Sequence, residues 1–278
     1  MTGAEMRVLI SVDMEGIAGV VDPADVRPGE PEYERNRELM TDEANAAIAG
    51  VLANSADAEI LVTDAHAVFR NLLPTRLDPA AKLLRGKPKA YSMMAGIDAS
   101  DHPMDAVVFI GYHGRAGRGM SVLSHTLSGA SVAEVRLNGE PIGEVGLNVA
   151  LAAHFGAVPV LAAGDDTVAE EASEAAPGIR TVVVKRALGG TAAENLHPSE
   201  ACRQITDGVT KALRGRDDIR PRTYDGAIEV EVEALKPSMT EYAELVPGVS
   251  RVDGRTVRAT VDDMAAAYRM VTLLVHLA

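Results

Sequence analysis

Short apolar runs alternate with amphipathic stretches along most of this 278-residue chain. The runs at 8–12, 59–63 and 106–110 have the length of buried strands, and apolar residues recur at helical spacing over 34–53. A parallel strand covered on both faces is a continuous apolar run, and a crossover helix usually joins it to the next strand. The alternation therefore predicts an α/β fold, with a mostly parallel sheet flanked by helices.

The pattern of apolar and charged residues changes in the last third of the chain. A helical pattern at 198–213 leads through a charged linker at 214–221 to strands in which apolar and acidic residues alternate. We therefore predict a metal-binding catalytic α/β domain at 1–186 and a smaller α+β portion at 187–278. Further strands are expected at 132–137 (closed by an Asn138-Gly139 turn), 158–162, 180–184, 227–232 and 256–260, with helices at 143–155 and 262–276.

Charge and composition exclude several classes of partner. Forty acidic residues against 27 basic ones give a net charge of −13, which argues against nucleic acid because phosphate binding needs a clustered positive surface. No apolar run approaches the ~20 residues of a membrane span, and no secretion signal is visible at the N-terminus. The single cysteine excludes an internal disulfide. We expect a cytoplasmic protein with no nucleic-acid or membrane partner.

Metal-ligating residue types follow three of the predicted strands. Asp13 and Glu15 come after the first strand, and their i, i+2 spacing on an extended chain points both carboxylates to one side. His66 follows the strand at 59–63, and His113 follows the strand at 106–110. Since the carboxyl ends of parallel strands meet in one crevice, the three segments together predict a metal site there. Asp64 is a possible hydrogen-bonding partner of His66.

Two further residues carry weaker signals. Glu144 falls in the first turn of the helix expected after the hairpin, where a carboxylate also complements the helix dipole. His125 lies in a polar Ser-His-Thr loop, where a solvated histidine is the ordinary explanation. The nitrogen and oxygen donors of this set suit zinc, manganese or cobalt. No H-E-x-x-H helix, phosphate-binding loop, dinucleotide fingerprint or G-x-S-x-G elbow is present.

Taken in order, these segments resemble the zinc-dependent D-aminopeptidases of the DppA type. One departure is visible, because Ala65 and Ala67 stand after Asp64 and His66 where that family leads us to expect Ser and Gly. The departure concerns fine geometry and substrate choice more than metal binding. The matching segments are SVDMEG (11–16), TDAH (63–66), RNLLP (70–74), GYH (111–113), SHT (124–126), GEVGLN (143–148), AGDD (163–166) and VKR (184–186).

The resemblance implies a metallo-aminopeptidase with two divalent ions, expected to be Zn²⁺. It acts on a small peptide with an N-terminal D-residue, such as a D-alanyl dipeptide, through water activated by the two ions. It also implies assembly into a ring-like homo-oligomer, such as a decamer. The residue roles implied are Asp13 as the bridge, Glu15 and His66 on one ion, His113 and Glu144 on the other, and His125 as the acid–base residue.

Two other functions fit the same residues. A two-metal phosphoesterase or another amidohydrolase uses a similar ligand set, and Arg70, Arg115 and Arg118 could then contact a phosphate. A non-catalytic metal-binding oligomeric protein would use the histidines structurally. Activity on a phosphate ester compared with activity on an amino-acid anilide separates the two kinds of enzyme. Tight metal binding without turnover of either substrate would favour the non-catalytic metal-binding protein.

Overall fold

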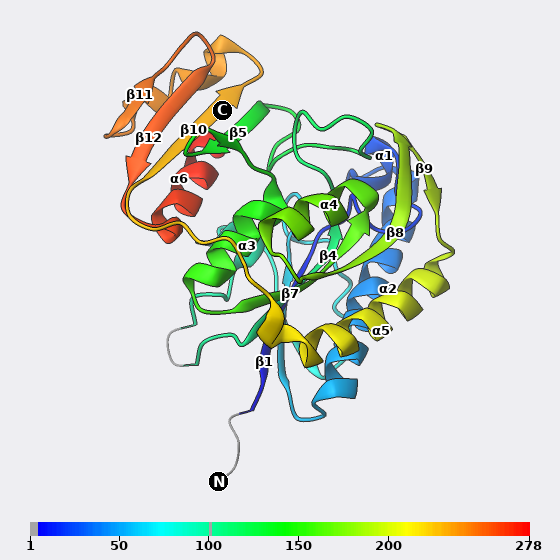
Figure 1. Cartoon of the computed structure of the whole chain (residues 1–278). Coiled ribbons are helices and arrows are strands. Elements are labelled where there is room, and N and C mark those ends of the chain that lie inside the picture. The colour runs from blue at the N-terminus through cyan, green and yellow to red at the C-terminus, as the bar shows by residue number, and fades with distance from the viewer. Residues whose placement is uncertain (1–4, 100–101) are drawn as a thin grey trace.

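The computed structural model describes residues 5–99 and 102–278, and its centre is a seven-stranded sheet (Figure 1). The strand order is β3-β2-β1-β4-β7-β8-β9, in which all neighbours are parallel except β8 and the edge strand β9. The central strands are apolar and buried, as the continuous apolar runs predict. The strands are β1 (Arg7–Val12), β2 (Glu59–Asp64), β3 (Ala81–Leu84), β4 (Ala106–Tyr112), β7 (Val158–Asp165), β8 (Arg180–Gly189) and β9 (Ala192–Asn195).

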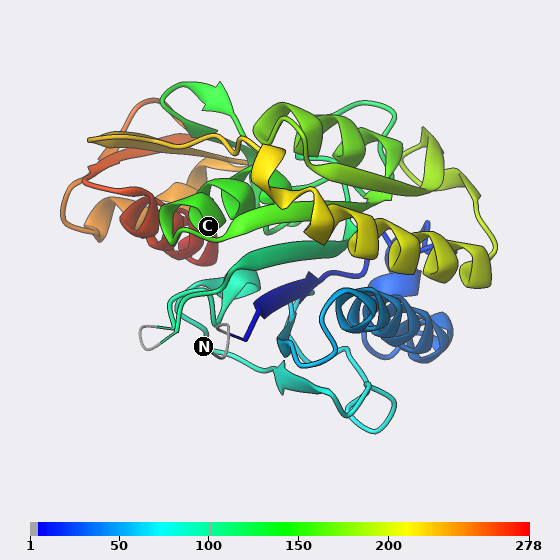
Figure 2. The same ribbon diagram turned by 60° about the horizontal axis from the view of Figure 1, so that its bottom comes forward.

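Helices cover both faces of this sheet (Figure 2). The helices α2 (Pro31–Asn54) and α5 (Pro198–Arg214) pack together on one face, and Thr206 Oγ1 on α5 donates to the Ala46 carbonyl on α2 at 2.9 Å. On the other face lie α3 (Glu144–His154) and α4 (Asp166–Ala175), and a short α1 (Pro23–Val26) precedes α2.

A second sheet of five antiparallel strands, in the order β11-β12-β10-β5-β6, lies beside the first. The turn between β5 and β6 is the predicted one, with Asn138 at φ 51° and Gly139 at φ 79°. The C-terminal helix α6 (Met264–Leu277) packs against β10 and α3. The strands are β5 (Val132–Leu137), β6 (Glu140–Pro141), β10 (Ile228–Ala234), β11 (Val249–Arg251) and β12 (Thr256–Val261).

The predicted fold class is confirmed, although β3, β9, β11, α1 and α4 were not predicted. The strands are three or four residues long and partly exposed, so no apolar run marks them. The proposed division at residue 186 stays a prediction. After this residue, β9 still pairs in the first sheet and α5 packs against it, whereas β5 and β6 precede the residue and pair in the second sheet. Single 3₁₀ turns occupy Ser92–Met94, Arg216–Asp218, Pro237–Thr240 and Ala243–Leu245.

The sheet order fixes where a ligand can bind. The strand β1 lies between β2 and β4. From β1 the strand order runs through β2 and β3 to one edge of the sheet, and through β4, β7, β8 and β9 to the other edge. A crevice opens at the carboxyl ends of such neighbouring strands. Within the described residues, no helix is both long enough and apolar enough to cross a membrane.

Candidate metal centre

The segments that follow β1 and β4 lie in close backbone contact. The Asp13 amide donates to the Ile110 carbonyl at 2.8 Å, and the Gly16 amide donates to the Gly111 carbonyl at 2.7 Å. A Cβ atom on Gly16 would lie 1.9 Å from the Tyr112 carbonyl oxygen, so only glycine fits. This contact holds the acidic segment after β1 against the segment that carries His113.

Asp13, Glu15 and His66 form the first of two clusters of ligand atoms. His66 Nδ1 lies 2.9 Å from Glu15 Oε2 and 3.4 Å from Asp13 Oδ1. All three side chains are buried, and their ligand atoms lie within 4.8 Å of one another. The three residues thus offer one nitrogen and several carboxylate oxygens around a single point.

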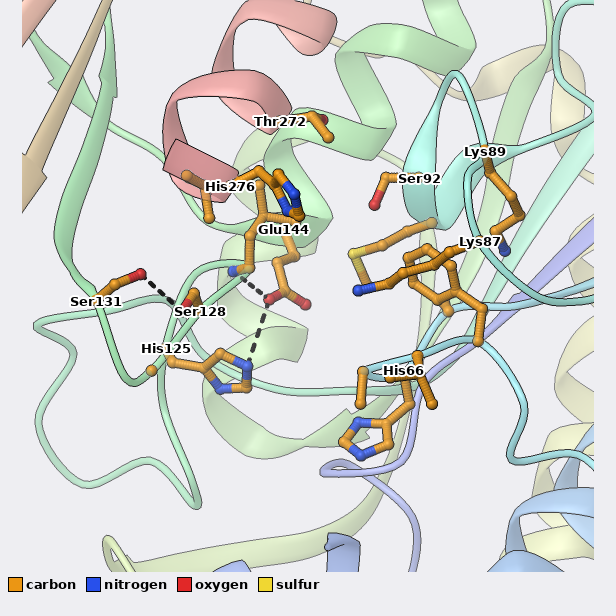
Figure 3. Close-up of a pocket in the computed structure, with 18 of the residues that line it drawn as sticks. His66, Lys87, Lys89, Ser92, His125, Ser128, Ser131, Glu144, Thr272 and His276 are labelled. Carbon is orange, nitrogen blue, oxygen red and sulfur yellow. Dashed lines mark hydrogen bonds and ion pairs between the residues drawn. The ribbon is translucent and has the colours of Figure 1, made fainter. Parts of the chain in front are cut away.

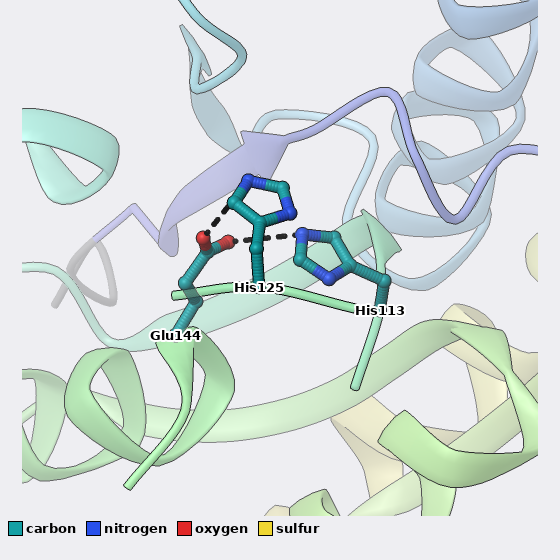
Figure 4. A group of neighbouring side chains, drawn as sticks. All are labelled: His113, His125 and Glu144. Carbon is teal, nitrogen blue, oxygen red and sulfur yellow. Dashed lines mark ion pairs between the residues drawn. The ribbon is translucent and has the colours of Figure 1, made fainter. Parts of the chain in front are cut away.

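The second cluster consists of His113, Glu144 and His125 (Figure 4). His113 Nε2 lies 3.4 Å from Glu144 Oε2, and His125 Nε2 lies 3.8 Å from Glu144 Oε1. The two imidazole rings stack with their centroids 4.4 Å apart and an interplanar angle of 15°. The His125 side chain is 21% exposed and that of His113 is fully buried, so His125 is the one that a bound molecule can reach.

The carboxylate of Asp13 joins the two clusters. Its Oδ1 faces His66 Nδ1 at 3.4 Å, and its Oδ2 faces His113 Nε2 at 3.5 Å. Each oxygen of one carboxylate is therefore directed at a different cluster. This is the arrangement in which a carboxylate can bridge two ions, and it places the predicted bridging residue between the predicted ligands.

Backbone carbonyls orient all three imidazoles. His66 Nε2 lies 2.9 Å from the Val26 carbonyl, His113 Nδ1 lies 3.0 Å from the carbonyl of Gly114, and His125 Nδ1 lies 2.8 Å from that of Leu123. Because a carbonyl oxygen can only accept, each of these nitrogens carries the proton. The other nitrogen of each ring faces the carboxylates, where it can carry a proton in the absence of metal or give it up and ligate an ion, as metal-ligating histidines do.

The electrostatics of the clusters favour bound cations. Burial alone raises the pKa of Asp13, but the neighbouring imidazoles of His113 and His66 outweigh it and hold that pKa well below its usual range. Burial likewise lowers the pKa of His66, whereas the neighbouring Glu15 and Asp13 carboxylates raise it well above the usual value. Without metal, protons on the histidines offset the carboxylate charges, and divalent cations can take over that role.

Two atoms of the second cluster have no hydrogen-bond partner among the described residues. These atoms, His113 Nε2 and Glu144 Oε2, are buried and face each other. A buried polar atom without a partner is costly, and a shared metal ion would satisfy both. The nitrogen and oxygen donors of the two clusters suit zinc, so the residues present fit the ions that the sequence predicts.

Asp64 has a different partner from the one considered in the sequence. Its carboxylate accepts the Asn71 amide at 2.5 Å, the Asn71 side-chain amide at 2.7 Å and the Leu72 amide at 2.8 Å, and it does not bond His66. Asp64 instead closes the loop that presents His66. In that loop Ala67 has φ 49°, a left-handed conformation that favours the glycine expected there.

Sequence reasoning missed the anchors of the two loops that carry the site. Lys185 on β8 is buried, and its ammonium donates to the carbonyls of Glu15, Ile17 (3.0 Å) and Val20 (2.5 Å). In the sequence, the segment that contains Lys185 indicates only a family resemblance, because a lysine within a strand carries no signal of this role. Similarly, Asp165 accepts a hydrogen bond from Ser121 Oγ at 2.9 Å in the loop that leads to His125.

A pocket of about 1220 Å³ opens above the clusters (Figure 3). Asp13, Glu15, His66, His125 and Glu144 line it, and buried His113 lies behind them. The helix α6 and the loop after β3 form its other walls. The structure thus brings all six predicted site residues together at the base of one pocket, and their individual roles stay predictions.

Comparison with known proteins identifies the family to which this chain belongs. A family model described as D-aminopeptidase matches residues 6–273. A D-aminopeptidase from Bacillus subtilis (strain 168) is 36% identical over 274 residues, which is 98% of both chains. The solved structure of the Zn-dependent D-aminopeptidase DppA from Bacillus subtilis, described as a self-compartmentalizing protease, matches with a TM-score of 0.92 at 35% identity, covering 98% of this chain and 97% of that one. The chain therefore belongs to the D-aminopeptidase family and is a peptide-bond hydrolase.

Proposed function

We propose that this protein is an aminopeptidase that releases an N-terminal D-residue from short peptides and uses two zinc ions to do so. The observation that carries the proposal is the shared Asp13 carboxylate, which faces both ligand clusters at the base of the pocket. Asp13 would bridge the ions. Glu15 and His66 would complete the ligands of one ion, and His113 and Glu144 those of the other.

The ions and the protein supply different parts of the chemistry. Bound zinc lowers the pKa of a coordinated water and polarises a carbonyl oxygen. The chain holds the ligands rigidly, since their imidazoles are tied to backbone carbonyls. His125 keeps its Nδ1 proton on the Leu123 carbonyl and its side chain is 21% exposed, so Nε2 can take a proton from the attacking water and donate it to the leaving amine. A histidine suits this task because one ring nitrogen can accept and release a proton while the other keeps its own.

Peptide class and assembly are inferred from the Bacillus relatives. Both are named D-aminopeptidases, and the solved one is described as self-compartmentalizing. We extend to this chain the D-stereochemistry, a substrate such as a D-alanyl dipeptide, and a ring-like homo-oligomer such as a decamer. Light scattering on the purified protein tests the assembly, and a monomer would contradict it. The cytoplasmic location stays a prediction from sequence.

The first experiment measures zinc and activity on the same sample. We expect about two zinc ions per chain, and cleavage of D-Ala-D-Ala but not of L-Ala-L-Ala. A chelator should abolish the cleavage, and added zinc should restore it. Failure to bind zinc under any condition would overturn the proposal. Equal cleavage of the two dipeptides would remove the stereochemical part of it.

Replacing His125 tests its assigned role. We expect His125→Ala to retain both ions and to lower kcat by at least about 100-fold, the usual contribution of a positioned acid–base group. The matched control is His154→Ala, which removes an exposed histidine at the end of α3. Loss of one zinc ion from the His125 variant would instead make this residue a ligand, a role that its position in the second cluster also permits. Full activity would exclude both roles.

The two rival functions are weaker in this structure. The three arginines that the sequence offers to a phosphoesterase, Arg70, Arg115 and Arg118, do not line the pocket among the described residues, and the cations that do are Lys87, Lys89 and Arg269. Arg118 pairs with Glu170, and Arg115 lies 3.6 Å from Glu134. A non-catalytic metal protein does not need an exposed histidine beside its ligands. Hydrolysis of p-nitrophenyl phosphate in preference to a D-alanine p-nitroanilide would revive the first rival.

A further inference from the structure

The pocket wall formed by the loop after β3 presents two lysines on one aromatic ring. The ammonium groups of Lys87 and Lys89 lie 5.1 Å and 3.9 Å from the ring centroid of Phe69. Phe69 itself belongs to the His66 loop, since its amide donates to the His66 carbonyl at 2.7 Å, and its carbonyl accepts the Gly86 amide at 2.6 Å. Both lysines therefore pack on the loop that carries His66, a candidate metal ligand.

The cations that line the pocket differ in what they already bind. The Lys89 ammonium donates to the Asp64 carbonyl at 2.5 Å and to Thr63 Oγ1 at 3.0 Å, and Arg269 donates to the Tyr91 hydroxyl at 3.0 Å. Within residues 5–99 and 102–278, the Lys87 ammonium has no hydrogen bond or ion pair, and it lies over the Phe69 ring. Figure 3 shows Lys87 extended into the pocket toward Glu144, and Lys89 turned away from it.

The balance of charge in the pocket favours an anionic ligand. The acidic side chains that line it are Asp13, Glu15 and Glu144, and all three belong to the ligand clusters. Two divalent ions bring four positive charges against these three negative ones. With the ions bound, a solvent-accessible ammonium therefore faces a site that no longer carries net negative charge, and a ligand carboxylate would find a partner there.

We propose that Lys87 binds the free α-carboxylate at the C-terminal end of a short peptide substrate. The proposal rests on the proposed aminopeptidase function and adds to it a subsite that recognises the far end of the peptide. Each further extended residue moves that carboxylate by about 3.5 Å. Because the Lys87 side chain reaches only a limited distance from its backbone position, it can contact the carboxylate of peptides within a narrow range of lengths. This contact therefore selects peptides by length as well as by charge.

A binding experiment separates carboxylate recognition from turnover. The probe is a reduced dipeptide, D-Ala-ψ[CH2NH]-D-Ala, compared with its C-terminal amide by calorimetry on the zinc-loaded protein. A charge-assisted hydrogen bond contributes about 1.5–3 kcal/mol, so the acid should bind about 10- to 100-fold more tightly than the amide. In Lys87→Met that ratio should fall to about one, and in Lys87→Arg most of it should remain.

The matched control is Lys82→Met on β3. Lys82 lies outside the pocket and pairs with Glu59 at 2.9 Å, so the acid-to-amide ratio should not change. An unchanged ratio in Lys87→Met would overturn the proposal. So would an equal loss of affinity for acid and amide, because Lys87 would then act on a part of the ligand that both share. Failure of the acid to bind the wild-type protein would also overturn it.

Kinetics on D-Ala-D-Ala and its amide distinguish this proposal from the function on which it rests. We expect Lys87→Met to lower kcat/KM for the acid by about 10- to 100-fold and to leave the amide nearly unchanged. If neither substrate is hydrolysed while the binding preference persists, the carboxylate subsite stands and the peptidase proposal fails. If both are hydrolysed equally well by the wild-type protein, the subsite fails and the peptidase proposal stands.

Discussion

Glu43 on α2 is a buried carboxylate next to the segment that carries the metal-ligand candidates. Its Oε1 accepts the Ala18 amide at 2.9 Å, and its Oε2 has no hydrogen-bond partner among the described residues. Burial raises the pKa of Glu43 from 4.5 to about 7, although the Ala18 amide and the charge of Lys185 act in the opposite direction. The native protein therefore binds this proton more tightly than the unfolded chain does.

The sign of the effect on stability follows from that difference. A raised carboxyl pKa contributes stability that is fully present below pH 4.5 and is lost as the pH rises through about 7. The shift from 4.5 to about 7 is about 2.5 pKa units, and each unit corresponds to 1.36 kcal/mol. Ionisation of Glu43 should thus lower the free energy of unfolding by about 3 kcal/mol between pH 4.5 and pH 8.

The substitution Glu43→Gln isolates this contribution. Glutamine keeps an acceptor for the Ala18 amide and cannot ionise, but its new amide group adds a cost that does not depend on pH. The measurement is therefore the difference in unfolding free energy between wild type and variant, from denaturant titrations of metal-free protein at several pH values. The variant should gain about 3 kcal/mol relative to wild type from pH 4.5 to pH 8.

A difference that stays constant with pH would refute this reasoning. It would mean that Glu43 has the same pKa in the folded and unfolded states, and that its burial is offset by interactions that the structure does not contain. If the variant instead lost unfolding free energy relative to wild type as the pH rises, the effect would have the opposite sign to the one expected. It would make the pair with Lys185, rather than desolvation, the dominant influence on this carboxylate.

Two substitutions test how the fold holds the site. Lys185→Met leaves the buried carbonyls of Glu15, Ile17 and Val20 without their donor, so we expect a loss of about 3 kcal/mol in unfolding free energy and weaker zinc retention. Thermal melting and zinc content check this, and unchanged zinc affinity would mean that the loop is held by other contacts. Gly16→Ala places a Cβ atom 1.9 Å from a backbone oxygen of β4, so we expect little folded protein, and near-normal expression and melting would contradict the close approach.

Much of the site could be predicted because its residues follow apolar strands directly. A parallel sheet brings the carboxyl ends of its strands to one edge, so Asp13, Glu15, His66 and His113 could be grouped from their positions after strands alone. His125 and Glu144 were assigned by resemblance, because a loop histidine and an acidic first turn are common without any function. The structure brings all six to one pocket.

Contacts between residues far apart in the chain were decided only by the tertiary structure. Lys185 reaches the Glu15 carbonyl across 170 residues, and Val26 orients His66 through a carbonyl that every residue type possesses. Nor could the sequence distinguish Lys87 from Lys89, since their difference lies in which oxygens surround each ammonium. Local periodicity determines strands, helices and the edge at which polar residues meet. The partner of each polar atom depends on how those elements pack, and only the folded chain specifies that.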